Sequence, residues 1–195
     1  MQQNTPNIVS FGPIMPVRPT ALILGSAPSD ASLRNKEYYG NKHNAFWPII
    51  CQIFSTFSTA NATSVAASSC YQQRIQLLIR CRIALWDMLA SCERAGSLDS
   101  SINRASEKPN PIAALLDDQP SIRLVCCNGG KAMALFKRHA QSVIKRSPSS
   151  YNLLQLPSTS PAYASLNQQG KYRKWRDALA PLLNTPSVDP ASING

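Results

Sequence analysis

Four short hydrophobic runs punctuate the chain, at residues 20–24, 82–85, 122–127 and 152–156. Within each run the hydrophobic residues are largely continuous and do not alternate with polar ones. Such runs are typical of strands that are covered on both faces of a sheet. We therefore predict four buried strands at these positions.

Between the runs, hydrophobic residues recur every three or four positions, which is the spacing of one buried helix face. The stripes comprise Phe46, Ile49, Ile50, Ile53 and Phe54; Ile112, Leu115 and Leu116; Ala132, Leu135 and Phe136; and Trp175, Leu179 and Leu182 in a closing helix over residues 172–183. Strands that alternate with helices predict an α/β domain with a central, mainly parallel four-stranded sheet.

The chain has 195 residues, the length of one ordinary domain. We expect a single domain over residues 20–183, preceded by an irregular N-terminal arm over residues 1–19. Residues 184–195 have the composition of a flexible tail. The serine- and alanine-rich residues 58–69 are expected to form a loop.

Each predicted strand is followed by a distinctive loop, and the four loops are GSAPSD, WDMLASC, NGGK and PSTSPA in chain order. Ligands of open α/β sheets bind at the carboxyl ends of the strands, so we expect these loops to converge on one site. Three of the loops are rich in small or polar residues, which allow close backbone approach and offer neutral hydrogen-bond donors.

The positive charge of the chain favours a polyanionic partner. The formal net charge is +10, and no acidic residue lies between Asp118 and Asp177, where ten lysines and arginines occur. Clustered cations neutralise a polyanion and release its counterions, which favours a nucleic-acid partner. A solvated basic surface is the alternative interpretation.

Several chemistries have no signature here. The six cysteines and the two histidines, His43 and His139, show no metal-ligand spacing, so we expect reduced thiols and neither a metal nor a cofactor. The phosphate-binding loop and dinucleotide fingerprints are absent, and so is G-x-S-x-G. No run is long enough to span a membrane and no secretory signal is evident, so we expect a cytoplasmic protein.

Carboxylates are scarce near the predicted site, where only Asp30, Glu37 and Asp87 lie close to strand ends. The site must then work mostly with neutral hydrogen bonds, dipoles and an aromatic face. This inventory suits a flat, polar, uncharged ring such as a nucleobase. Asp87 is interpreted either as a hydrogen-bond acceptor behind the site or as the N-cap of a helix after Trp86.

Four segments, in order and with compatible spacing, resemble the DNA-deoxyinosine (hypoxanthine-DNA) glycosylases, a branch of the uracil-DNA glycosylase superfamily. They are LGSAPSDASL…YYGNKHNAFWPII, ALWDMLASCERAGSLDS, NGGKA and LPSTSPAYASL, within a resemblance that runs from about Ile23 to Leu183. The resemblance implies a three-layer α/β/α sandwich. It also implies a monomeric enzyme that flips a deaminated base out of double-stranded DNA and hydrolyses its N-glycosidic bond without a metal or a lyase step, which initiates base excision repair.

The resemblance further implies roles for individual residues. Asn44 and Ser26 are expected to be catalytic, with Asn44 binding or orienting the water or the base. Phe46 is expected to stack on the flipped base. The other expected base contacts are Gly25, Ala27 and Asn128, and the expected DNA contacts are Ser158, Thr159, Ser160, Pro161, Tyr163, Lys131 and Lys171.

Three positions depart from the pattern expected of the superfamily. Ala27 stands where better-known branches carry a polar residue that activates water, and we expect Asn44 to take over that role. Ser29 stands where relatives usually have glycine. Tyr163 stands where asparagine or a small residue is expected, which suggests a wedge that enters the DNA helix.

Without the resemblance, several of these residues would be assigned ordinary structural roles. Phe46 and Trp47 would be core residues of a helix. Asn44 would be a helix N-cap, which it could be in addition to its catalytic role. Ser158 and Ser160 would be turn residues.

Three classes of function stay open at this stage. The first is a glycosylase that acts on hypoxanthine, or in a close variant on uracil or mismatched thymine. The second is a DNA-binding protein that has lost catalysis, which Ala27 and Ser29 would favour. The third is an enzyme of free nucleosides or nucleotides, which would not need the basic stretch.

Overall fold

Four parallel strands form the central sheet of the computed structural model, which describes residues 5–54, 70–145, 147 and 150–183. The predicted loop at 58–69 and the predicted tail at 184–195 lie outside the described residues. The strands are β2 (Ala21–Gly25), β3 (Ile83–Asp87), β6 (Leu124–Asn128) and β7 (Asn152–Leu156), in the order β3-β2-β6-β7. Each begins within two residues of its predicted position, so the predicted α/β class and parallel sheet are confirmed.

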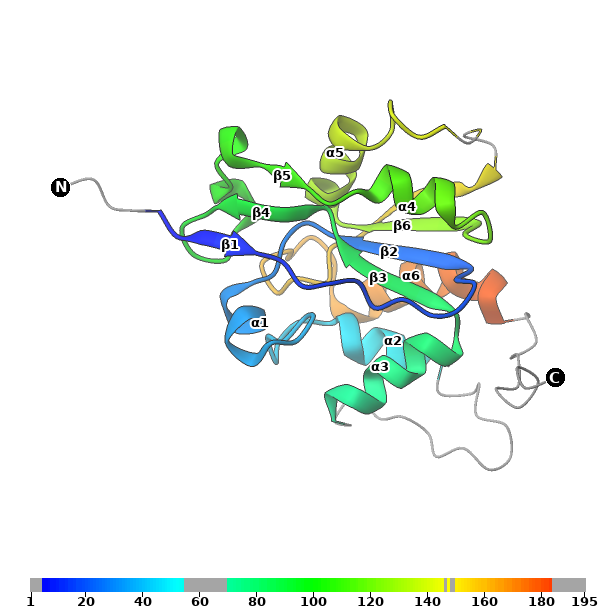
Figure 1. Cartoon of the computed structure of the whole chain (residues 1–195). Coiled ribbons are helices and arrows are strands. Elements are labelled where there is room, and N and C mark those ends of the chain that lie inside the picture. The colour runs from blue at the N-terminus through cyan, green and yellow to red at the C-terminus, as the bar shows by residue number, and fades with distance from the viewer. Residues whose placement is uncertain (1–4, 55–69, 146, 148–149, 184–195) are drawn as a thin grey trace.

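Helices cover both faces of this sheet, which gives three layers (Figure 1). One face carries α2 (Phe46–Phe54), α3 (Tyr71–Arg80) and α6 (Gln168–Leu183), and the other carries α4 (Ile112–Asp118) and α5 (Gly130–His139). Successive residues of β2 join opposite layers: Ile23 packs with the α2 side and Leu24 with the α5 side. This two-sided burial explains why the strand residues are continuously hydrophobic.

A small antiparallel sheet continues from the carboxyl end of β3, a feature that the sequence analysis did not predict. Met88 alone separates β3 from β4 (Leu89–Glu93), and β4 pairs with β1 (Asn7–Val9) and with β5 (Lys108–Pro109). The interpretation of WDMLASC as a loop was therefore wrong, and so was that of Asp87 as a helix cap. The N-terminal segment, expected to be an irregular arm, contributes β1.

Three short helices complete the described part of the chain: α1 (Asp30–Asn35), η2 (Asp99–Ser101) and η3 (Arg104–Ser106). None of the helices in the described ranges is long and apolar enough to cross a membrane. The same residues contain no group of three histidine, cysteine or acidic side chains placed to hold a metal ion. All six cysteines are free thiols.

Candidate functional site

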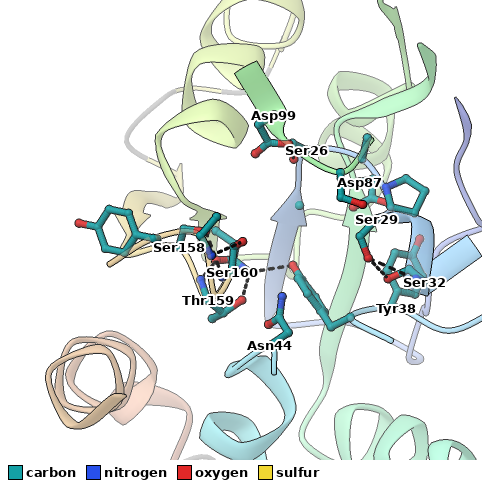
Figure 2. A pocket seen from close by; sticks show the side chains of 18 of the residues that line it. Ser26, Ser29, Ser32, Tyr38, Asn44, Asp87, Asp99, Ser158, Thr159 and Ser160 are labelled. Carbon is teal, nitrogen blue, oxygen red and sulfur yellow. Dashed lines mark hydrogen bonds between the residues drawn. The ribbon is translucent and has the colours of Figure 1, made fainter. Parts of the chain in front are cut away.

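A pocket of about 280 Å³ opens at the carboxyl edge of the parallel sheet, close to the lower limit of small-ligand pockets, roughly 300–1,000 Å³. The loops after β2 and β7 meet there, as predicted, together with the ends of β3 and β6 and the loop after β4 (Figure 2). The polar side chains that line the pocket include Ser26, Tyr39, Asn44, Asp87, Asp99 and Asn128.

Asn44 lies at the pocket and at the head of helix α2. Its Oδ1 accepts a hydrogen bond from the Phe46 backbone N–H at 2.9 Å, so the side chain caps the helix. Among the described residues its Nδ2 has no hydrogen-bond partner, and Figure 2 shows the side chain facing the hollow. The same amide therefore stabilises the helix through its oxygen and presents two N–H donors to a ligand.

Phe46 does not line the pocket, which corrects the prediction that it stacks directly on the base. It is fully buried, with edge-on contacts to Trp47 and Trp175. Its ring stacks on Tyr39, with centroids 3.9 Å apart and an interplanar angle of 24°. Tyr39, which the sequence analysis passed over, is an aromatic residue that does line the pocket.

The backbone of Tyr39 is unusual, with φ at 53° in the left-handed region that bulky residues rarely adopt. Its ring is held by the stack on Phe46, and its hydroxyl accepts a hydrogen bond from Asn128 Nδ2 at 2.9 Å. Strained backbone that is fixed in this way is often found at functional sites.

Asn128 and Thr159 tie three loops together. Asn128 Nδ2 donates to the Tyr39 hydroxyl and, at 2.8 Å, to Thr159 Oγ1, while its Oδ1 accepts from the Thr159 N–H at 2.9 Å. The Thr159 carbonyl in turn accepts from the Ala45 N–H at 3.0 Å. Both amide hydrogens of Asn128 are thus used within the protein. Thr159, predicted to contact DNA, is buried and turned inward.

The end of β2 lies beside the end of β3 at the floor of the pocket, where Gly25 is in register with Asp87. A Cβ atom added at Gly25 would lie 2.3 Å from Asp87 Oδ1, so only glycine leaves room for this carboxyl group. Asp87 is 4% exposed, and its Oδ2 accepts a hydrogen bond from Ser10 Oγ at 2.7 Å. Burial raises the pKa of Asp87 to about 7; the charge of Asp99 adds to the rise, and Ser10 and Arg94 oppose it.

Ser26 and Ser29, both in the loop after β2, make different hydrogen bonds. Ser26 Oγ donates to Asp99 Oδ1 at 2.6 Å, which leaves the lone pairs of its hydroxyl free to accept from a ligand or water. Ser29 Oγ accepts from the Ser32 N–H at 3.2 Å and caps helix α1. This cap is a structural reason for serine at position 29. Ala27 lines the pocket without a polar group.

A buried arginine, Arg94, holds in place the wall of the pocket formed by residues 97–99, which the sequence did not predict. Arg94 is 1% exposed and donates from Nη2 to the Pro28 carbonyl and from Nε to the Gly96 carbonyl, each at 2.6 Å. It thereby joins the first loop to residues 97–99, which line the pocket. Little in the sequence indicates this wall, because residues 97–99 are a short polar segment whose one hydrophobic residue, Leu98, is exposed.

Two predicted DNA-binding lysines are engaged inside the protein. Lys171 is 5% exposed, donates from Nζ to the Ser160 carbonyl at 3.0 Å and lies 5.3 Å from the Tyr163 ring centroid; burial lowers its pKa. Lys131 is paired with Glu107 at 3.3 Å and does not line the pocket. Neither lysine has the exposed, unpaired ammonium group that a phosphate contact needs, so these two predictions do not fit the geometry.

The loop after β7 retains the other predicted DNA contacts. Ser158, Ser160 and Tyr163 line the pocket, while Pro161 is exposed beside it. The Ser158 hydroxyl accepts from the Ser160 N–H and the Ser160 hydroxyl from the Ala162 N–H, each at 3.2 Å. These bonds are those of turn residues, and they shape a rim that faces solvent.

Comparison with known proteins gives the class to which this fold and pocket correspond. The chain belongs to the uracil DNA glycosylase superfamily, whose family model matches residues 12–183. This match confirms the resemblance predicted from the four sequence segments.

Particular relatives make the comparison more specific. The chain is 39% identical over 111 residues to a protein of Methanosarcina acetivorans named hypoxanthine DNA glycosylase, and the match covers 57% of this chain and 64% of the relative. It is 34% identical over 122 residues to a protein of the same name from Methanosarcina barkeri, covering 63% of this chain and 71% of the relative. The chain thus spans slightly less than two thirds of the first relative and slightly more of the second.

The fold also matches a structure solved in solution by NMR, that of a Methanosarcina acetivorans protein provisionally assigned as a uracil DNA glycosylase. The TM-score is 0.71 at 28% sequence identity, and the match covers 90% of this chain and 98% of the other. The three-layer fold is therefore shared with this structure and agrees with membership of the superfamily.

Proposed function

We propose that this protein is a DNA glycosylase that hydrolyses the N-glycosidic bond of hypoxanthine in double-stranded DNA. Membership of the superfamily supports the reaction, and the names of the two archaeal relatives support the base. The observation that carries the proposal is the amide of Asn44, whose Oδ1 is fixed by the helix cap while its Nδ2 faces the pocket.

The pocket offers the groups that a deaminated purine needs. Hypoxanthine is flat and uncharged, and it presents a ring N–H together with oxygen and nitrogen acceptors. The Tyr39 ring gives an aromatic wall, and Asn44 gives neutral donors. Extruding the base from the duplex costs a few kcal/mol and costs less for a mismatched base, which favours deaminated bases over normal pairs.

The mechanism that we infer separates bond breaking from water attack. The bond between C1′ and N9 breaks, and its electron pair remains on the base, where neutral donors stabilise the developing negative charge. The sugar becomes cationic, and negative charge on the Asp99 carboxylate, which lines the pocket, and on the flanking DNA phosphates stabilises this cation. Water held by Asn44, with Ser26 Oγ as an acceptor, adds to C1′ and releases its proton to solvent.

We infer that the rim formed by Ser158, Ser160 and Tyr163 contacts the DNA strand around the flipped nucleotide. Arg173 and Lys174, both exposed in the first turns of α6, lie near this rim because Lys171 of the same helix binds the Ser160 carbonyl. We propose that one copy of the chain acts on duplex DNA in this way and that the reaction needs no metal ion.

The experiment uses labelled duplexes that carry one deoxyinosine, one uracil or one thymine mismatch, incubated with the protein and EDTA. Alkali then cleaves any abasic site. We expect breakage at inosine. Breakage only at uracil or thymine would retain the reaction and replace the base, whereas DNA binding without breakage in any duplex would overturn the proposal in favour of a binding protein.

A further inference from the structure

We propose that Asp87 is a catalytic acid of this site: its neutral carboxyl group donates a hydrogen bond from Oδ1 to the departing base, so that excision requires Asp87 to be protonated. This inference rests on the proposed glycosylase function and assigns a second acting residue to the same pocket. It gives Asp87 a role distinct from that of Asn44, which holds the attacking water.

The position of Asp87 leaves one carboxyl oxygen available to a ligand. Oδ2 accepts from Ser10 Oγ at 2.7 Å, whereas Oδ1 has no hydrogen-bond partner among the described residues. Oδ1 lies directly over Gly25, where a Cβ atom would stand 2.3 Å away. With Ser10 donating to Oδ2, the acid proton belongs on Oδ1, on the side of the pocket floor.

The surroundings of Asp87 favour its neutral form. It is buried at the floor, and Asp99 supplies a further negative charge from η2. Arg94, the cation that opposes this effect, already donates to the carbonyls of Pro28 and Gly96. Ser10 from the N-terminal segment is the one hydrogen-bond partner that the described residues give the carboxyl group.

Three tyrosines belong to the titratable groups around Asp87: Tyr71, whose pKa is raised mainly by burial, and the two pocket residues Tyr38 and Tyr39. Tyr38 donates its hydroxyl to the carbonyls of Phe11 and Gly12, and the Tyr39 hydroxyl accepts from Asn128. Burial raises the pKa of both pocket tyrosines well above the usual range, so neither ionises near neutral pH. No histidine lines the pocket. With the pKa of Asp87 raised to about 7, its ionisation falls within the range where enzymes are assayed.

The chemistry of the leaving group explains why the neutral acid is needed. The edge of hypoxanthine carries an N–H donor beside a carbonyl oxygen. A neutral carboxyl group suits this edge, since its O–H on Oδ1 donates to the carbonyl oxygen, while Oδ2 keeps its hydrogen bond from Ser10. As the C1′–N9 bond breaks, negative charge spreads to that carbonyl oxygen. A donor there stabilises the charge, whereas an ionised carboxylate at the same place would repel it.

The test is the pH dependence of single-turnover excision from an inosine duplex, with enzyme in excess, between pH 5.5 and 9, the range around a pKa of about 7. We expect a plateau at low pH and a fall of about tenfold per pH unit above the pKa of Asp87. Asp87→Asn carries a neutral donor at every pH, so its rate should be lower than the wild-type plateau and flat with pH. Asp87→Ala should be slow throughout.

A second variant keeps the proposal falsifiable if changes at Asp87 disturb folding. Ser10→Ala lies outside the pocket lining and removes the one hydrogen bond that favours the ionised carboxylate. We expect its descending limb to move to higher pH while the low-pH plateau stays at the wild-type level. The carboxyl ¹³C chemical shift of Asp87, followed by NMR without DNA, should show the same displacement.

The outcomes separate the two proposals. Absence of excision by wild-type protein at every pH would defeat the proposed function. Excision of inosine with no fall in rate up to pH 9, or a descending limb that is identical in wild type, Asp87→Asn and Ser10→Ala, would defeat the role of Asp87 while leaving the glycosylase intact.

Discussion

Asn44 caps α2 with its Oδ1 and is proposed to act in excision through its Nδ2, and substitution can separate these two roles. Asn44→Ala removes both, and we expect it to lower single-turnover excision of inosine at least tenfold and to cost about 1 kcal/mol of stability through the lost cap. Asn44→Asp retains an oxygen for the Phe46 N–H and removes the N–H donors.

The aspartate variant is thus a matched control for the helix cap. We expect Asn44→Asp to unfold near the wild-type melting temperature. We expect it to excise inosine more slowly than wild type, because it lacks the N–H donors. Wild-type rates in Asn44→Asp would assign the function to the oxygen and not to Nδ2. Wild-type rates in Asn44→Ala would remove Asn44 from the mechanism altogether.

At the residue scale, the sequence predicted some site residues and not others for identifiable reasons. Asn44 was proposed as a site residue through the resemblance of its segment to the deoxyinosine glycosylases, whereas its place before an apolar helix alone indicates an N-cap. Phe46 belongs to the same stripe, and spacing alone could not separate a core ring from a pocket ring. Tyr39 sits in a polar loop with φ at 53°, and no periodicity indicates where such a side chain points.

Among the elements, the loop after β7 depends on its hydrogen bonds to the end of β6. Thr159→Val keeps the shape of the side chain but removes the acceptor of Asn128 Nδ2. A buried donor without a partner costs about 1–3 kcal/mol, so we expect this loss in urea unfolding. Excision should also fall, since the same network holds Tyr39.

Thr159→Ser is the control for this prediction because it retains the hydroxyl and loses only a methyl group, worth about 1 kcal/mol or less. Its excision rate should be close to that of wild type. Full stability and activity in Thr159→Val would mean that the network does not position the loop.

The elements also show where pattern analysis stops. The four parallel strands were found because each is buried on both faces. β4 was missed because its residues, LASCE, lack the β-branched and aromatic side chains that strands favour. β1 and β5 have only three and two residues, too few for any period to appear. Their pairing partners are also distant in sequence.

Over the whole molecule, the basic stretch between Asp118 and Asp177 contains two kinds of cation: some are bound within the protein and others are exposed. Lys131 and Lys171 are held by Glu107 and by the Ser160 carbonyl, whereas Arg173 and Lys174 are exposed. Charge counting predicts the partner class but cannot make this distinction, because it depends on the fold.

The division leads to a prediction about salt. Replacing Arg173 and Lys174 together by serine should weaken binding to every duplex. It should also reduce the slope of log affinity against log salt by about 1.8, or 0.9 for each phosphate contact. Fluorescence anisotropy at several salt concentrations measures both effects.

Arg123 provides the control, since it precedes β6 at the amino edge of the sheet, away from the pocket, and donates to the Ser150 carbonyl. Arg123→Ser should leave the slope unchanged. An equal loss of slope in both variants would mean that the cations act only through net charge.

The contact between Ser10 and Asp87 spans 77 positions of the chain and reaches from the N-terminal segment to the floor of the pocket. A protease cut or a bulky fusion near residue 10 would leave every parallel strand intact and yet alter the acid strength of Asp87. If the proposed role of Asp87 holds, preparations with ragged N-termini should therefore behave as mixtures of molecules that excise best at different acidities, although each carries the same pocket residues.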